Sequence, residues 1–159
     1  MSQYTLSKWM KLIIILLGIC GIGVYAVFVP VVGSNFTTAY PEFAYCFVPW
    51  LVFLLLTAIP CCIVLVLGWQ IASSIKADES FTHKNAKRLK YISALALATS
   101  IYVFVGNFVF FLLNMNHPSV LITSMLLVFV GISVSVVFAV LSHLVTKAAQ
   151  LQVQSDLTI

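Results

Sequence analysis

From Tyr91 to Thr146 the chain reads YISALALATSIYVFVGNFVFFLLNMNHPSVLITSMLLVFVGISVSVVFAVLSHLVT, 56 residues without a single Asp, Glu, Lys or Arg. A helix that crosses the hydrocarbon core of a bilayer needs about 20 mostly apolar residues, so this run has room for two. Its break is the polar turn Asn114-Met115-Asn116-His117-Pro118, where the proline suits the first turn of the next helix. The stretch therefore predicts two membrane-spanning helices joined by a short turn.

Two more stretches without charged residues, 12–41 and 43–75, each have room for one spanning helix. The first is longer than the roughly 7–15 apolar residues of a signal peptide, so we expect a retained helix. The predicted spans are 12–32, 49–75, 91–113 and 120–145, with a loop at 76–90 and a tail at 146–159. The remaining pieces are too short for a folded domain. The sequence therefore predicts an all-α integral membrane four-helix bundle, with residues 1–159 forming one transmembrane domain.

The composition agrees with this prediction. Hydrophobic residues make up 62% of the chain, charged residues only 8%, and the mean hydropathy is +1.13. Soluble domains carry about 25% charged residues. So few charges exclude an ordinary soluble enzyme, a free nucleic-acid-binding domain and a disordered protein, and they make the lipid bilayer the first expected partner.

The basic residues predict an orientation. They occur in the N-terminal tail, between the second and third spans, and after the fourth span. Cytoplasmic segments of membrane proteins carry an excess of Lys and Arg, so these three regions, including both termini, are predicted to be cytoplasmic. The eight bases are Lys8, Lys11, Lys76, Lys84, Lys87, Arg88, Lys90 and Lys147.

The sequence offers no catalytic or metal-binding set. No ionisable Asp, Glu, Lys or Arg lies inside a predicted span, although such residues usually mark proton-coupled pathways. The four cysteines form no Cys-x-x-Cys pair, and the three histidines lie at or beyond the predicted membrane boundaries. We therefore expect no enzyme activity, no cofactor and no metal.

Small and polar residues inside the spans favour close helix packing. Gly131, Ser135 and Ala139 recur at every fourth position and form a narrow ridge on the fourth span. Asn107 is expected to hydrogen-bond to a neighbouring helix, and Pro60 to bend the second span. The ridge suits packing within the chain, and contact between copies in a homo-oligomer is the alternative.

The segment between the second and third spans carries the clearest local signal. Thr82 is a good N-cap for a helix that runs into the third span, and Phe81 precedes it as a hydrophobic staple. The bases that follow stand at a helix N-terminus, where they oppose the helix dipole. Two explanations remain open: topology with attraction to anionic headgroups, or a docking surface for a cytoplasmic protein. One short helix cannot supply both base readout and a scaffold, so we expect no direct nucleic-acid binding.

Two motifs resemble those of a known family. Residues 81–92, FTHKNAKRLKYI, resemble the pattern F-[ST]-x-x-N-x-x-[RK]-L-x-x-I, and the ending SDLTI at 155–159 resembles [EQ]-x-D-L-T-I. Both are similar to motifs of the bacterial domain-of-unknown-function 2975 family of small four-helix membrane proteins. Here Gln154-Ser155 replaces a more acidic pair, which leaves the tail less acidic.

The resemblance implies a context in the bacterial cytoplasmic membrane. Genes of this family often stand beside one for a small helix-turn-helix DNA-binding protein of the Cro/repressor type. The resulting hypothesis is a non-enzymatic regulatory or scaffolding partner of such a regulator. The residues expected to form the docking site, or to cap helices and tie the loop to the tail, are Phe81, Thr82, Asn85, Arg88, Leu89, Asp156, Leu157 and Ile159.

The alternative is a small oligomeric transporter, channel or export/immunity factor. It would need polar residues from several copies lining a water-filled path, and Asn107, Ser100 and Ser124 are the candidates inside the spans.

Overall fold

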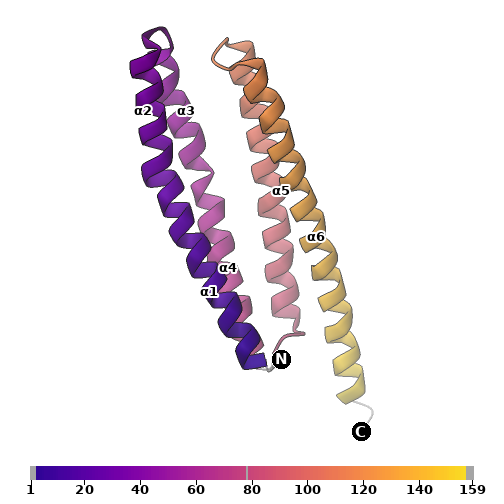
Figure 1. Cartoon of the computed structure of the whole chain (residues 1–159). Coiled ribbons are helices and arrows are strands. Elements are labelled where there is room, and N and C mark those ends of the chain that lie inside the picture. Colours follow the sequence, from indigo (N-terminus) through magenta and orange to yellow (C-terminus); the bar gives the residue numbers. More distant parts are fainter. Residues whose placement is uncertain (1–2, 78, 157–159) are drawn as a thin grey trace.

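The computed structural model describes residues 3–77 and 79–156, and it confirms the all-α fold (Figure 1). No strand occurs in these two ranges. Four helical stretches are long and apolar enough to cross a membrane, as predicted. The elements are α1 (Gln3–Ile22), the π-helical η1 (Gly23–Phe28), α2 (Val29–Ala39), the 3-10 turn η2 (Pro41–Phe43), α3 (Ala44–Leu56), α4 (Ala58–Lys76), α5 (His83–Leu112) and α6 (Pro118–Asp156).

The helices extend beyond the predicted spans. Helix α5 begins eight residues before its predicted span, and α6 continues from its predicted end at 145 to Asp156. Hydropathy marks only the part of a helix that suits the hydrocarbon core. Polar helix formers such as Gln150 and Gln152 let the backbone continue past that boundary.

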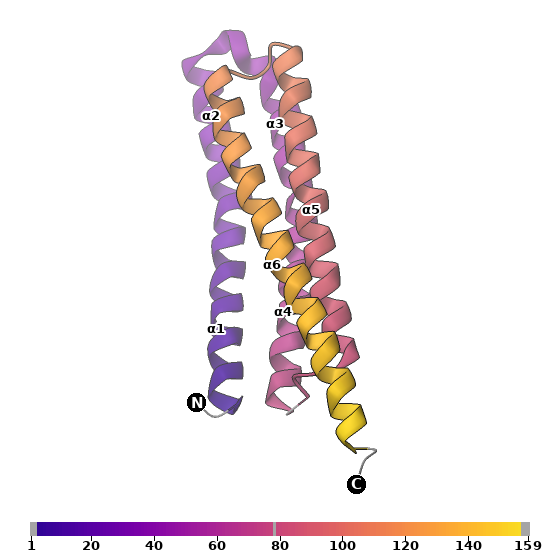
Figure 2. The ribbon, with the colours of Figure 1, turned by 90° about the vertical axis from the view of Figure 1, so that its right-hand side faces the viewer.

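The helices pair into two hairpins (Figures 1 and 2). In the first hairpin, α1, η1 and α2 run antiparallel to α3 and α4; in the second, α5 packs along α6. We call the end with the α2–α3 and α5–α6 connections the turn end. The opposite end holds the start of α1, the α4–α5 connection and the end of α6, and all eight bases lie toward it. We call it the basic end.

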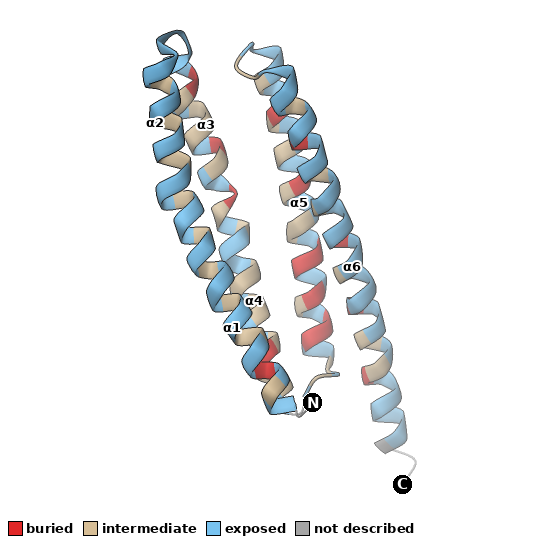
Figure 3. Ribbon diagram, in the orientation of Figure 1, coloured by how far each residue is buried: buried red, intermediate tan, exposed pale blue. Residues whose placement is uncertain are grey.

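Burial follows the pattern of a membrane protein. Large apolar side chains cover the outer surface, and Ile122 and Leu126 on α6 are 70% and 65% exposed. Figure 3 shows the buried residues on inward faces, above all on α5. Serine, threonine and asparagine dominate this interior, which suits helices that associate through small residues and hydrogen bonds rather than the hydrophobic effect. The buried polar residues are Ser7, Thr57, Asn85, Ser93, Ser100, Asn107, Ser124, Ser135 and Ser142.

The interface of the second hairpin repeats every seven residues. Buried positions of α5 include Ala86, Ser93, Ser100 and Asn107, and those of α6 include Ser135, Ser142 and Ala149. A seven-residue repeat keeps one seam of each helix facing its partner. Helices packed in this way generally cross at about +20°.

Small side chains hold this seam together. The hydroxyls of Ser93 and Ser135 each donate to the other residue's carbonyl at 2.8 Å, and Ser142 Oγ donates to the Ala86 carbonyl at 2.8 Å. A Cβ on Gly131 would overlap the Ser100 side chain, so glycine permits this approach.

Only part of the ridge predicted on α6 lies in the seam with α5. Gly131 and Ser135 lie in the seam, but Ala139 is exposed. A spacing of four residues exceeds one helical turn, and each step rotates the position by about 40° around the helix. The ridge drifts out of the seam after Ser135.

Asn107 is buried, but its partners differ from the expected neighbouring helix. Its Nδ2 donates to the Val103 carbonyl of its own helix at 2.9 Å. Its Oδ1 accepts a 3.1 Å hydrogen bond from Nδ2 of Asn116, in the α5–α6 turn. This amide therefore fixes the turn to the end of α5.

An aromatic cluster joins the two hairpins toward the turn end. The ring of Phe53 on α3 stacks on Tyr102 of α5 at a centroid distance of 4.8 Å, and Tyr102 Oη donates to the Phe53 carbonyl at 3.2 Å. A Cβ on Gly106 would overlap the Phe53 ring. The missing side chain at Gly106 is what lets α3 and α5 approach here.

The two helical arms of the first hairpin are each irregular near the middle. The bend expected from Pro60 is an interruption at Thr57 between α3 and α4, because proline has no N–H for the Leu56 carbonyl. Opposite it lies η1, a π-helical segment just before Pro30. Tyr25 Oη and Thr57 Oγ1 are 2.8 Å apart and share a hydrogen bond, which ties the two irregularities together.

Candidate functional site

The 81–92 motif begins at the N-cap of α5, at the basic end. Thr82 has an extended backbone, and its hydroxyl accepts a hydrogen bond from the Asn85 backbone N–H at 3.3 Å. Such a cap satisfies one of the free N–H groups of the first turn. Thr82 therefore fixes where the third span starts.

Asn85 closes the connection between the hairpins. Its side chain is 1% exposed, and its Nδ2 donates to the carbonyls of Glu79 at 3.0 Å and Ser80 at 3.3 Å. Its Oδ1 accepts from Arg88 Nη1 at 2.7 Å. These three hydrogen bonds require a side chain that both donates and accepts, and the amide of Asn85 does both. Because it is buried, Asn85 acts within the chain.

Arg88 connects α5 to the first hairpin. The same Nη1 donates to Ser74 Oγ at 3.0 Å and lies 3.5 Å from the Gln70 carbonyl, in the last turns of α4. A cation at a helix C-terminus also interacts favourably with the free carbonyls and the dipole. Arg88 is half-buried. It links α4 to α5.

The other motif positions divide between interior and surface. Leu89 and Ile92 are buried beside this network, whereas Phe81 is 56% exposed. Asp156 is the last residue of α6, and Leu157 and Ile159 lie outside the described residues. The structure brings Thr82, Asn85 and Arg88 together as a clamp. We call these three residues the basic-end clamp.

A shallow groove of about 290 Å³ lies beside the clamp. It forms because α6 extends past the start of α5, so the last turns of α6 face the residues around the Thr82 cap. Gln152 and Val153 on α6 lie across from Phe81 and His83. The spacing of residues within one segment gives no signal for this groove, because its walls come from segments about 70 residues apart. Its lining residues are Phe81, Thr82, His83, Ala149, Gln152 and Val153.

Exposed lysines follow the groove residues of α5 along the chain. Lys84, Lys87 and Lys90 are all exposed on the first two turns of α5, and Lys87 Nζ lies 5.9 Å from the centroid of the Tyr91 ring. The clamp uses Arg88 alone among these bases. The lysines remain available to anionic headgroups or to an acidic partner.

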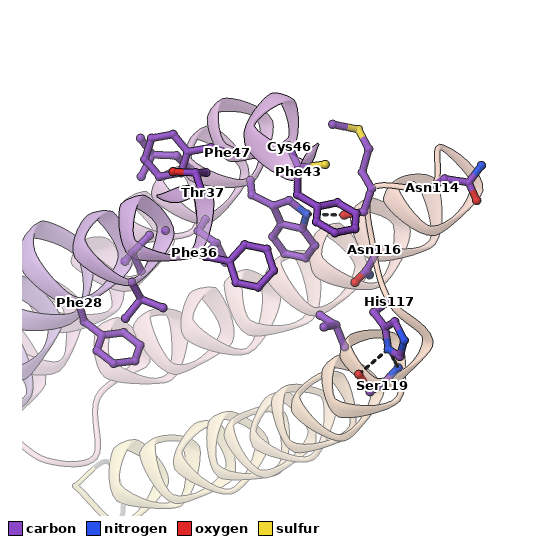
Figure 4. A pocket seen from close by; sticks show the side chains of 18 of the residues that line it. Phe28, Phe36, Thr37, Phe43, Cys46, Phe47, Asn114, Asn116, His117 and Ser119 are labelled. Carbon is purple, nitrogen blue, oxygen red and sulfur yellow. Dashed lines mark hydrogen bonds between the residues drawn. The ribbon is translucent and has the colours of Figure 1, made fainter. Parts of the chain in front are cut away.

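A second and larger pocket lies at the turn end, between α2, α3 and the α5–α6 turn (Figure 4). Its volume is about 810 Å³, and its walls are mainly Phe, Val and Leu side chains with Trp50. The sequence motifs did not predict this pocket, although the aromatic residues around Pro41 are a signal for an apolar surface there. No group of His, Cys, Asp or Glu in the described ranges has the arrangement of a metal site.

Four spanning helices, an apolar outer surface and bases at one end define a multi-pass bacterial membrane protein. The chain belongs to the family described as "Protein of unknown function (DUF2975)", whose model matches residues 31–159. It is also similar to the "Uncharacterized membrane protein YoaS" of Bacillus subtilis (strain 168). The two are 28% identical over 155 residues, 95% of this chain and 96% of that protein. No solved structure matches the chain.

Proposed function

We propose that this protein is a non-enzymatic membrane scaffold that holds a small cytoplasmic helix-turn-helix transcription regulator at its basic end. The observation that carries the proposal is the groove between the start of α5 and the end of α6, at the end of the molecule where the exposed lysines of α5 also lie. The positive-inside rule orients this end toward the cytoplasm.

The projecting end of α6 supports a protein partner. After Lys147 the helix continues for nine residues, about 13 Å, to Asp156. Leu151 and Val153 on this segment are 65% and 53% exposed. Exposed apolar side chains at the end of the molecule that carries the bases suit an amphipathic helix with acidic residues, a common form of peptide recognition.

The clamp has a supporting role in this proposal. Thr82 and Asn85 set the start of α5, and Arg88 fixes α5 to α4, so the groove and lysines have a defined geometry. Burial makes Asn85 and Leu89 unsuitable for direct contact with a partner. The surface contacts would come from Phe81, the lysines and the end of α6, with Asp156, Leu157 and Ile159 as the adjoining tail.

The alternative, a small oligomeric transporter, channel or export/immunity factor, has less support. Its candidate polar residues already bond within the chain: Ser100 donates to Ala96, Ser124 to Leu121, and Asn107 to Val103. The larger pocket is mainly apolar and so does not suit ions.

The test is co-purification of the full-length protein from membranes of its native host, with the captured proteins identified by mass spectrometry. We expect a small helix-turn-helix protein with the wild type. The double variant Lys84→Glu, Lys87→Glu should recover about 10-fold less of it, because two exposed positive charges at the basic end are reversed. The control variant Lys8→Glu, Lys11→Glu has the same charge change on α1 and should retain recovery.

Membrane yield of both variants is measured first, because the bases also direct insertion. Absence of any helix-turn-helix protein from the wild-type sample would contradict the proposal. Equal losses with both variants would show a general charge effect rather than a docking surface.

A further inference from the structure

The pocket at the turn end has the form of a site for an elongated apolar molecule. Phe28, the last residue of η1, and Val32 and Phe36 of α2 lie at intervals of four and line one wall along about 12 Å of helix. Trp50 and Leu54 of α3 line the facing wall. A volume of about 810 Å³ with mostly apolar walls falls in the range typical of small-molecule pockets.

The end of the pocket at the α5–α6 turn is polar. His117 Nδ1 and Ser119 Oγ are hydrogen-bonded at 2.8 Å, and Figure 4 shows both side chains at this end with Asn116. Trp50 Nε1 donates to the Met115 carbonyl at 3.0 Å, which fixes the turn against α3. The pocket therefore combines an apolar length with a polar cap, as an amphiphilic ligand requires.

Asn116 adds an unpaired acceptor at the same place. Its Nδ2 faces two oxygens of Asn107, the side-chain Oδ1 and the carbonyl, so the amide orientation is fixed by its partners. Its Oδ1 is buried and, within the described part of the chain, has no hydrogen-bond partner. Buried acceptors are nearly always paired. A ligand that brings a hydroxyl to this end would supply the donor after a small adjustment of the side chain.

The charges near the turn end limit which polar head group a bound amphiphilic ligand can have. Glu42 is the only charged residue in the two connections of the turn end, and all eight bases lie toward the other end. A phosphate head would meet no compensating cation here. The head that fits is uncharged and carries a hydroxyl.

The pocket walls can also adapt in width. The first hairpin's share of the pocket runs from Phe28, the last residue of η1, to Leu54, three residues before the interruption at Thr57. π-helical segments and proline sites are where helices bend. We therefore expect any adjustment of the pocket width to arise at these two places.

We infer that this pocket binds the acyl chain of a neutral, hydroxyl-bearing lipid such as a monoacylglycerol, with the chain along α2 and the hydroxyls at the α5–α6 turn. Much of the lining comes from helices apolar and long enough to span a membrane, so we expect the ligand to be a membrane lipid. This site is separate from the proposed docking groove, and neither depends on the other.

The test uses purified full-length protein in detergent with two probes of equal chain, monoolein and methyl oleate, which lacks hydroxyl groups. Monoolein is expected to raise the midpoint of thermal unfolding in a saturable way, because a ligand that binds the folded state stabilises it. Methyl oleate should bind about 3- to 10-fold more weakly, corresponding to one or two hydrogen bonds.

Two matched substitutions locate the site. Val32→Trp fills the pocket and should abolish the monoolein shift. Val31→Trp adds the same side chain next to it, at a position that does not line the pocket and is 49% exposed compared with 47% for Val32. It should leave the shift unchanged.

Asn116→Leu tests the polar end and should remove the preference for monoolein over methyl oleate. This variant also loses the hydrogen bond to Asn107, so only the shift produced by each probe is compared with the variant alone.

Three results would overturn the inference. The first is equal stabilisation by monoolein and methyl oleate, and the second is an equal effect of Val31→Trp and Val32→Trp. The third is a change of oligomeric state in Val32→Trp with unchanged monoolein binding, which would make the pocket an interface between copies.

Discussion

Oδ1 of Asn85 accepts a 2.7 Å hydrogen bond from the guanidinium of Arg88, and the same nitrogen donates to Ser74 at the end of α4. Two residues of one sequence motif thereby connect the two hairpins of the bundle. This relationship explains why an asparagine and an arginine stand three positions apart at the start of α5. The basic end has a defined shape because this connection holds.

Replacing Asn85 tests the clamp. Asn85→Ala removes two hydrogen bonds to the connection and the acceptor for Arg88, so the free energy of unfolding should fall by about 2 kcal/mol. Unfolding by SDS in mixed micelles measures the change. Lys84→Ala, at the neighbouring exposed position, should alter it by less than about 0.5 kcal/mol. Equal effects at the two positions would mean that Asn85 does not act as a clamp.

Gly106 controls the approach of the hairpins. In Gly106→Leu the new side chain meets the Phe53 ring, and overpacking of this kind costs about 1–3 kcal/mol. Gly21→Ala is the control, because a Cβ there meets nothing within 4 Å. Thermal unfolding in detergent should show a lower midpoint for the first variant and an equal or higher midpoint for the second. An unchanged midpoint for Gly106→Leu would refute the contact.

The serine pair in the second hairpin is suited to a double-mutant cycle. Ser93→Ala and Ser135→Ala should each destabilise the protein, with a coupling energy of roughly 0.6 kcal/mol or more. Ser133 bonds only to the Phe129 carbonyl of its own helix and is exposed. A cycle of Ser93 with Ser133 should therefore give no coupling. Strict additivity in both cycles would remove the interhelical role of these hydroxyls.

The orientation predicted from the bases is open to a reporter test. Alkaline phosphatase needs disulfides that form outside the cytoplasm, whereas a fluorescent protein folds inside. Fusions after Ile159 should fluoresce and lack phosphatase activity, and fusions after Asn114 should show the reverse. Phosphatase activity at Ile159 would invert the topology and place the groove outside the cell.

Much of the fold was predictable because the membrane imposes it. Stretches without charge gave four helices, and the polar turn around Asn116 gave the break between the last two. Thr82 and Pro60 act through their own backbone neighbours, so their positions in the chain were informative. Such local effects can be predicted from a single sequence.

The parts that were missed depend on contacts between segments. Ala139 was expected in the packing ridge, but whether a helix follows a spacing of four or of seven residues is decided by its partner α5. The partner of Asn107 is set by how the turn folds over it. The groove and the pocket likewise combine distant segments. The burial of Asn85 could not be inferred from a motif that looks polar and exposed.

We propose that a cytoplasmic regulator occupies the groove between Phe81 and the end of α6. Photocrosslinking in living cells tests it most directly, with a benzophenone amino acid at Gln152, which lines the groove, or at exposed Gln150, which does not. We expect a crosslink to a small helix-turn-helix protein at position 152 that is lost with Lys84→Glu, Lys87→Glu, and none at position 150. Crosslinks to lipid alone at position 152, or equal protein crosslinks at both positions, would contradict it.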